Sequence, residues 1–130
     1  MDCIFCKIVN GEIPCLKLYE DDLVMALLDI NPDSDGHTLI IPKKHYIDLS
    51  DIDINTLNHI NMVSKKIKRL LEDKLHCEGM SLVQNNGFVQ EIKHYHLHLK
   101  PYYKAKKNIE MVKYNEYISD PKEVYKKISE

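Results

Sequence analysis

The chain has 130 residues and a mass of 15.2 kDa, which is enough for one compact domain and too little for two separate cores. Apolar residues make up 44% of the sequence and charged residues 29%, close to the average of soluble globular proteins, which argues against a disordered, collagen-like or membrane-embedded chain. The formal net charge is -2, so a protein that holds nucleic acid through a general positive field is disfavoured as well.

The first part of the chain is expected to form one helical turn followed by short strands. The turn is expected around residues 5–9, and Gly11 and Pro14 interrupt the helix after it. Apolar runs with turn residues between them, densest from Asn31 to Gly36, indicate a meander of strands. The strands are expected at residues 16–20, 23–30 and 38–41.

A long amphipathic helix is expected at residues 54–75, where apolar residues recur at three- and four-residue spacing with Lys and Arg between them. Gly79 is interpreted as the exit from this helix. Extended structure is expected at 81–84 and at 92–101, where apolar and polar residues alternate. Asp120-Pro121 predicts the start of a short final helix. These elements predict an α+β fold, with antiparallel sheet covered on one face by the long helix.

A single domain over residues 1–130 is expected, because no repeat, low-complexity tract or linker divides the chain. The first residues lack the basic and apolar segments of a secretory signal, and no apolar run is long enough to span a bilayer. We therefore expect a cytoplasmic protein. In a reducing compartment its four cysteines are expected to be metal ligands or free thiols and not two disulfides.

Three histidines alternate with apolar residues at His94, His96 and His98. Side chains two apart on a strand share a face and lie about 6.6 Å apart, so the three imidazoles are expected on one face. A single histidine there would usually be solvated or hydrogen-bonded, but a row offers a nucleophile, a proton donor and a further orienting or metal-binding ring. Phosphorus is a suitable electrophile, because attack by an imidazole nitrogen gives a reactive phosphoramidate that is then easily hydrolysed.

Cys3 and Cys6 have the two-residue spacer that lets two thiolates bind one Zn²⁺ at about 2.3 Å. The same spacing also occurs in redox motifs. A tetrahedral metal site needs two further ligands, which His45 and the histidine row could supply. Cys15 and Cys77 have no partner at a diagnostic spacing and are expected to be small buried hydrophobic residues.

Several polar residues fit more than one role. Asp29 ends an apolar strand before a turn, where its carboxylate could accept ribose hydroxyls or cap the turn. Taken alone, His37 and His45 are expected to be ordinary loop histidines. A lysine cluster could attract polyphosphate or form a solvated tail. It consists of Lys100, Lys104, Lys106 and Lys107.

Taken together, these residues resemble the zinc-containing, bacterial-type branch of the histidine triad (HIT) family of nucleotide hydrolases and transferases, whose signature is three histidines alternating with hydrophobic residues. The resemblance covers most of the chain and leaves a C-terminal extension from about residue 104. Beyond the triad, it rests on Cys3-Ile-Phe-Cys6-Lys-Ile, Gly-Glu-Ile-Pro at 11–14, Tyr-Glu-Asp-Asp at 19–22, Asp29-Ile-Asn-Pro, Gly36-His37-Thr-Leu-Ile-Ile-Pro-Lys and Gln-Asn-Asn-Gly at 84–87.

The resemblance implies a five-stranded antiparallel sheet with one long and one or two short helices, paired into a homodimer. It implies cleavage of the α-phosphate linkage of a nucleoside phosphoramidate or a dinucleoside polyphosphate, through a nucleotidyl-histidine intermediate. The expected partner is a purine nucleotide or nucleotide conjugate, with no nucleic acid and no membrane. The alternative is a catalytically weak, zinc-stabilised nucleotide-binding or scaffold protein.

The resemblance also assigns roles to single residues. It makes His96 the nucleophile on the α-phosphorus, places His98 against phosphate or leaving group, and gives His37 a supporting polar role. It assigns ribose hydroxyls to Asp29. The other substrate-binding residues that it implies are Ile4, Phe5, Leu27 and Ile30 in the walls of the base pocket, Asn86, or else Asn85, at the phosphate, and Gln90. The implied ligands of a structural Zn²⁺ are Cys3, Cys6, His45 and His94.

The chain departs from this family at two places. Many members carry a small residue and a hydroxyl just before the triad, where this sequence has Val89-Gln90-Glu91 and a loop about two residues shorter. Many bacterial members have arginine after the proline that follows the triad, where this sequence has Pro101-Tyr102. Glu91 is expected to repel an anionic polyphosphate if it faces the phosphates, and to be an ordinary strand-edge charge if it faces solvent.

Overall fold

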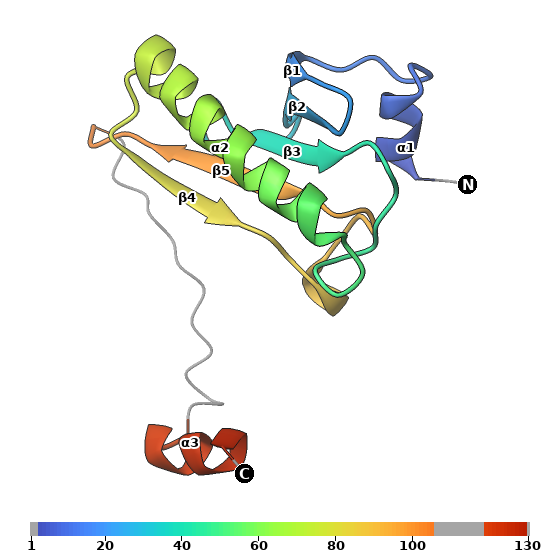
Figure 1. Ribbon diagram of the computed structural model, residues 1–130. Coiled ribbons are helices and arrows are strands. Elements are labelled where there is room, and N and C mark those ends of the chain that lie inside the picture. The colour runs from blue at the N-terminus through green and yellow to red at the C-terminus, as the bar shows by residue number, and fades with distance from the viewer. Residues whose placement is uncertain (1–2, 106–118, 130) are drawn as a thin grey trace.

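The computed structural model describes residues 3–105 and 119–129 (Figure 1). Helices and strands follow one another in the order expected for a meander, a long helix and a second pair of strands. They are α1 (Ile4–Val9), β1 (Lys17–Glu20), β2 (Val24–Leu28), β3 (Thr38–Pro42), α2 (Ile54–Leu75), β4 (Gly79–Val83), the 3₁₀ turn η1 (Gly87–Val89), β5 (Leu97–Tyr102) and α3 (Pro121–Ser129).

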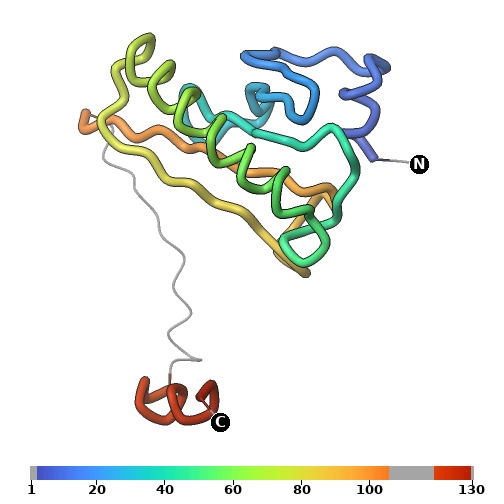
Figure 2. The backbone as a smooth tube through the Cα atoms, in the orientation of Figure 1, coloured from blue at the N-terminus to red at the C-terminus, as the bar shows by residue number. Residues whose placement is uncertain are grey.

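The strands form one five-stranded sheet in the order β1-β2-β3-β5-β4. Each neighbouring pair is antiparallel. The long helix α2 lies across one face of the sheet, where it packs against β3, β5 and β2 (Figures 1 and 2). The predicted α+β fold with a five-stranded antiparallel sheet is confirmed.

Both faces of the central strands are covered. Ala26 and Ile40 belong to the core cluster that α2 packs on, whereas Leu27 and Leu39 belong to a second cluster that includes Phe5 of α1. Strands buried on both faces read as continuous apolar runs, which explains why β2 and β3 show little alternation in sequence. The second cluster, on the face that carries α1, is the side on which the polar residues described below assemble.

The long helix has the bounds predicted from its periodicity. The Asp53 side chain caps its start by accepting a hydrogen bond from the Thr56 amide at 3.2 Å. The helix ends at His76, which takes the left-handed conformation with φ of 58°. The interpretation of Gly79 as the helix exit is wrong, because Gly79 already pairs with Tyr102 as the first residue of β4.

The strand predicted over residues 92–101 begins five residues later, at Leu97. The ladder with β3 stops at the pair Ile40–Leu97. Pro42, which would face Tyr95 in the same register, has no N–H to continue it. The Tyr95 amide donates instead to the Tyr46 carbonyl at 2.7 Å, in the segment that follows β3. The alternation of the side chains nevertheless continues, with Tyr95 and Leu97 both in the cluster beneath α2.

The turn between β2 and β3 positions Asp29, which follows β2, and His37, which precedes β3. Gly36 has φ of 90°, a backbone conformation that favours glycine, and a Cβ atom there would crowd Pro101 Cγ at 3.3 Å and displace the end of the Leu75 side chain. The Asp29 amide then donates to the His37 carbonyl at 2.9 Å. Asp29 and His37 therefore face one another at the end of the hairpin.

The predicted final helix is present as α3, and the Lys122 amide donates to the Asp120 side chain at 3.0 Å, as expected of a cap. Most of the expected extension lies outside the described residues, since 106–118 fall between 105 and α3. Within the described part of the chain, no helix is long and apolar enough to cross a membrane.

Candidate active site

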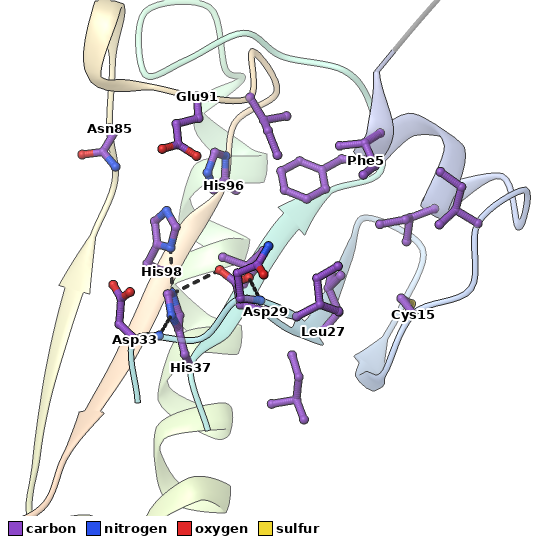
Figure 3. A pocket seen from close by; sticks show the side chains of 18 of the residues that line it. Phe5, Cys15, Leu27, Asp29, Asp33, His37, Asn85, Glu91, His96 and His98 are labelled. Atoms are coloured by element: carbon purple, nitrogen blue, oxygen red, sulfur yellow. Dashed lines mark hydrogen bonds and ion pairs between the residues drawn. The ribbon is translucent and has the colours of Figure 1, made fainter. Parts of the chain in front are cut away.

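A cavity of about 520 Å³ opens on the face of the sheet that carries α1 (Figure 3). This volume lies in the range of small-molecule sites. One side of the cavity is apolar and is formed by Ile4, Phe5, Ile8, Leu27, Ile30 and Leu39, among others. The other side is polar and is formed by Asp29, Asp33, His37, Asn85, Glu91, His96, His98 and Lys100.

The alternation of the triad brings its side chains to the face predicted from sequence. The ring of Phe5 lies 5.7 Å from that of His94 and 5.1 Å from that of His96, and the rings of His96 and His98 lie 4.8 Å apart. Two of the three rings, His96 and His98, line the cavity. The third, His94, is fully buried beside two cysteines.

The hydrogen bond of His96 settles which of its nitrogens carries the proton. Nδ1 lies 2.8 Å from the His94 carbonyl, which can only accept, so Nδ1 is protonated and Nε2 keeps a lone pair. Burial lowers the pKa of His96, and the His94 carbonyl and the carboxylates of Asp29 and Glu91 offset only part of this effect. His96 is therefore a neutral imidazole with an unprotonated nitrogen, as a nucleophile must be.

The opposite proton arrangement holds in His98. The Asp33 amide donates to Nδ1 of His37 at 3.0 Å, so the proton of the His37 ring is on Nε2. That nitrogen lies 2.9 Å from Nδ1 of His98, which must then accept, leaving the His98 proton on Nε2. Burial, together with the nearby imidazoles and Lys100, lowers the pKa of His98 to about 4, and burial also lowers the pKa of His37. Both rings are therefore neutral near pH 7.

Asp29 caps the turn that follows it, which is one of the two roles considered from sequence, and it also lines the cavity. One carboxylate oxygen accepts from the Asn31 amide at 2.9 Å and caps the turn. The other lies 3.6 Å from Nε2 of His37, and the residue lines the cavity beside the apolar wall. A metal among Asp29, His37 and His98, whose ligand atoms lie within 4.8 Å of one another, would need a lone pair on His37 Nε2, which the Asp33 hydrogen bond denies.

A second cluster consists of Cys3, Cys6, His45 and His94, whose ligand atoms also lie within 4.8 Å of one another. Cys3 caps α1 and Cys6 lies in its first turn, so the helix brings both thiols together. Nδ1 of His94 lies 3.4 Å from Cys3 Sγ and 3.1 Å from Nδ1 of His45, which lies 3.2 Å from Cys6 Sγ. A tetrahedral Zn²⁺ site requires separations of about 3.3–3.8 Å, so the four residues could bind a metal ion.

The surroundings of His94 prepare it as a ligand. Its Nε2 lies 2.8 Å from the Pro42 carbonyl, so the proton is on Nε2 and the Nδ1 lone pair faces the cysteines. Burial lowers the pKa of His94 to about 4, which keeps the ring neutral. Burial, with a further contribution from Cys3, raises the pKa of Cys6 to about 11, so a bound metal must displace the thiol proton.

Two of the residues implied for substrate binding are placed elsewhere. Asn86 Oδ1 accepts from the Leu49 amide at 2.9 Å, and Gln90 is buried with its side-chain amide donating to the Ile47 carbonyl at 2.6 Å. Neither is among the cavity-lining residues, and both instead hold the segment after β3 against the segment before β5. Of the two asparagines considered for the phosphate, Asn85 lines the cavity and Asn86 does not.

Three further residues differ from their sequence-based interpretation. Lys100 forms an ion pair with Asp33 at 2.8 Å, so it is not a freely solvated lysine. Cys15 lines the cavity, whereas Cys77 is buried as expected. Asp33 was missed by sequence reasoning: it lies in a dense turn cluster, but the role of its amide depends on a histidine four residues later.

Glu91 also lines the cavity, and in Figure 3 its carboxylate lies beside His96, on the side away from Phe5. Glu91 is also exposed to solvent, so its position combines features of the two orientations considered from sequence.

Known proteins are similar to this chain over most of its length. The family model of the HIT domain matches residues 10–105. An uncharacterised HIT-like protein of Methanocaldococcus jannaschii is 47% identical over 117 residues, which cover 88% of this chain and 88% of that protein. Adenosine 5′-monophosphoramidase hnt1 of Schizosaccharomyces pombe is 41% identical over 103 residues, covering 78% of this chain and 74% of that protein.

Among solved structures, that of a Zn-bound histidine triad family protein from Mycobacterium smegmatis is similar, with a TM-score of 0.80 and 35% sequence identity. The match covers 93% of this chain and 84% of that chain.

Proposed function

Because the chain belongs to the HIT family, we propose that it hydrolyses a nucleotide conjugate at the α-phosphorus through a covalent intermediate on His96. The observation that carries this proposal is the complementary protonation of two neighbouring rings in one cavity. His96 presents a nitrogen with a lone pair, and His98 presents an N–H. The name of the S. pombe relative, a phosphoramidase, supports a phosphorus–nitrogen bond as the one that is cleaved.

The two sides of the cavity match the two parts of a nucleotide. The apolar wall around Phe5 and Leu27 suits a purine base, which buries a flat aromatic surface. Asp29, at the junction of the apolar and polar sides, has carboxylate oxygens that accept hydrogen bonds from ribose hydroxyls. A nucleoside bound in this way directs its α-phosphate toward His96 and His98.

In the first half of the reaction, the Nε2 lone pair of His96 forms a bond to the α-phosphorus. The bond from phosphorus to the leaving group breaks, and its electron pair stays on the leaving nitrogen or oxygen. The imidazolium that forms keeps its Nδ1–H on the His94 carbonyl, at 2.8 Å in the structure. The Nε2–H of His98 donates to the phosphate oxygen or to the leaving atom as negative charge grows there.

In the second half, the oxygen of a water molecule attacks the phosphorus and the bond to His96 Nε2 breaks. The products are the nucleoside monophosphate and the unmodified imidazole. The hydroxyl of the water ends on phosphorus and its remaining proton balances the leaving group, so no further reactant is needed.

We propose zinc as the metal for Cys3, Cys6, His45 and His94, supported by their donor set and by the Zn-bound M. smegmatis protein. Two thiolates and two imidazoles would complete a closed structural site, so the ion would supply stability and not chemistry. The ligands would connect α1 to the segment after β3 and to the segment before β5. His94 would connect the two sites, because its side chain is a ligand and its carbonyl orients His96. A homodimer in the cytoplasm stays a prediction.

Turnover of adenosine 5′-phosphoramidate by the purified protein tests the proposal. We expect release of AMP, a covalent adduct of one adenylyl group on rapid denaturation at alkaline pH, and loss of both in His96→Ala while nucleotide binding persists. Wild-type turnover in His96→Ala would contradict the mechanism. Binding of the nucleotide without turnover in the wild type would identify the binding or scaffold protein that is the alternative.

A further inference from the structure

We infer that Glu91 makes this site selective for conjugates whose leaving group carries a positive charge. The inference rests on the proposed function and adds the chemical class of the substrate. Glu91 belongs to the same cavity as His96 and His98. Figure 3 shows it with Asn85 on the side of His96 opposite Phe5 and the apolar wall. A nucleoside on the apolar wall leaves this opposite end for the group that departs from phosphorus.

The side chains that line the cavity carry an excess of negative charge, which disfavours an anionic ligand. The charged side chains among its walls are Asp29, Asp33, Glu91 and Lys100. Lys100 is paired with Asp33 at 2.8 Å, so these two charges cancel. Apart from the histidines, this leaves the charges of Asp29 and Glu91. A phosphate that enters this cavity meets two uncompensated carboxylates, unless the substrate brings a cation of its own.

Of these two carboxylates, Glu91 is the one without another role. Asp29 accepts from the Asn31 amide and lies close to His37. Within the described part of the chain, no hydrogen bond or ion pair engages the Glu91 carboxylate. The nearest lysine in sequence, Lys93, donates to the carbonyls of Gly87 and Gln90 at 2.6 and 2.8 Å and so points elsewhere.

The sign of the effect follows from this arrangement. An ammonium group on the leaving amine is attracted by Glu91, whereas a carboxylate, sulfate or polyphosphate in the same place is repelled. Two unit charges about 10 Å apart, at an effective dielectric constant of about 20, change a binding constant by roughly tenfold. The expected selectivity between leaving groups that differ by one charge is therefore on the order of tenfold.

Three adenosine 5′-phosphoramidates of similar length test this inference, with a 2-aminoethyl, a 2-hydroxyethyl or a carboxymethyl group on the leaving amine. We expect kcat/KM of the wild type to fall from the ammonium to the hydroxyl to the carboxylate conjugate. Glu91→Gln keeps the shape of the side chain and removes its charge. In this variant the ratio of kcat/KM between successive conjugates should be smaller by about tenfold. Glu72→Gln is the matched control, because it removes the same charge from an exposed Lys68 pair on α2.

An unchanged order and spread in Glu91→Gln would overturn the inference and leave the proposed function intact. Wild-type preference for diadenosine polyphosphate with Mg²⁺ over the ammonium conjugate would also overturn it, because the cation would then come from solution. Binding of the three conjugates by the His96→Ala protein, with and without Glu91→Gln, separates the two proposals. The order of the affinities for the three conjugates tests the role of Glu91 even if the protein does not turn them over. If no conjugate is turned over, only the proposed function is overturned.

Discussion

The backbone amide of Asp33 donates a hydrogen bond to Nδ1 of His37 at 3.0 Å. A backbone N–H can only donate, so this contact decides the position of the proton on His37. Through the 2.9 Å contact between His37 and His98, it also decides the position of the proton on His98, the ring beside the proposed nucleophile. The His94 carbonyl decides the position of the proton on His96 in the same way. Two groups of the main chain, neither of which can titrate, therefore set the chemistry of two side chains.

The first prediction concerns His37 as a positioning residue. His37→Phe removes the donor to His98, so His98 can take either tautomer and loses its fixed N–H toward the substrate. We expect kcat to fall by roughly 10–100-fold with a smaller change in KM, and His37→Gln, whose amide can donate, to recover part of the loss. Steady-state kinetics on one phosphoramidate would check this.

His59→Gln provides the control for the substitution of a partly buried histidine. His59 bonds Asp21 at 2.6 Å, where α2 packs against the β1–β2 turn, and it does not line the cavity. Its kcat should equal that of the wild type. Equal kcat in His37→Phe and in the wild type would show that the tautomer of His98 does not matter.

The second prediction concerns the metal. Protein purified without chelators should contain one zinc ion per chain, and Cys6→Ser should lower this content, whereas Cys15→Ser should not. Removing the metal should lower the melting temperature by roughly 10 °C, because the site connects α1 to the rest of the domain. Elemental analysis and thermal unfolding test this, and protein without any metal that is equally stable would rule out the site.

The third prediction concerns pH. The pKa of His98 is lowered to about 4, chiefly by burial, against about 6.5 in an unfolded chain. Between these values the unfolded state binds more protons than the folded state, so the stability is complete above pH 6.5 and is lost as the pH falls toward 4. The loss from this group should be on the order of 2–3 kcal/mol, less than the full shift implies because solvent still screens the partly exposed ring.

Chemical denaturation of the wild type and of His98→Gln between pH 4 and pH 7 measures this contribution. The variant should lose less stability than the wild type over that range, because its amide does not titrate. Parallel curves for the two proteins would contradict the assignment.

The fourth prediction concerns the turn before His37. Gly36→Ala introduces a Cβ atom at a φ of 90°, where it displaces the end of the Leu75 side chain and crowds Pro101 Cγ at 3.3 Å, so it combines backbone strain with local repacking. We expect a loss of about 2–4 kcal/mol in the free energy of unfolding. Gly11→Ala is the control, because Gly11 has φ of 79° but a Cβ atom added there would meet nothing within 4 Å, so it should lose only about 1 kcal/mol. A similar loss in both variants would show that packing against Leu75 contributes nothing.

Several features were predictable from sequence because they depend on local interactions. The bounds of α2 follow from periodicity and from a capping aspartate, both contained within the helix itself. The alternation of His94, His96 and His98 continues even where the ladder is missing, because it reflects the preference of each side chain for core or cavity. The start of β5 was not predictable, because it depends on where β3 ends.

The sequence by itself determined the residue types of the proposed sites: a row of histidines, two cysteines with two histidines, and a carboxylate at a strand end. Only the tertiary structure decided which nitrogen of each ring carries the proton, that Asn85 and not Asn86 lines the cavity, and that Glu91 faces His96. The physical reason is that the sequence states which side chain stands at each position, whereas its proton, orientation and neighbours depend on partners far away in the chain. His37 and His98 are 61 residues apart, and Cys3 and His94 are 91 residues apart.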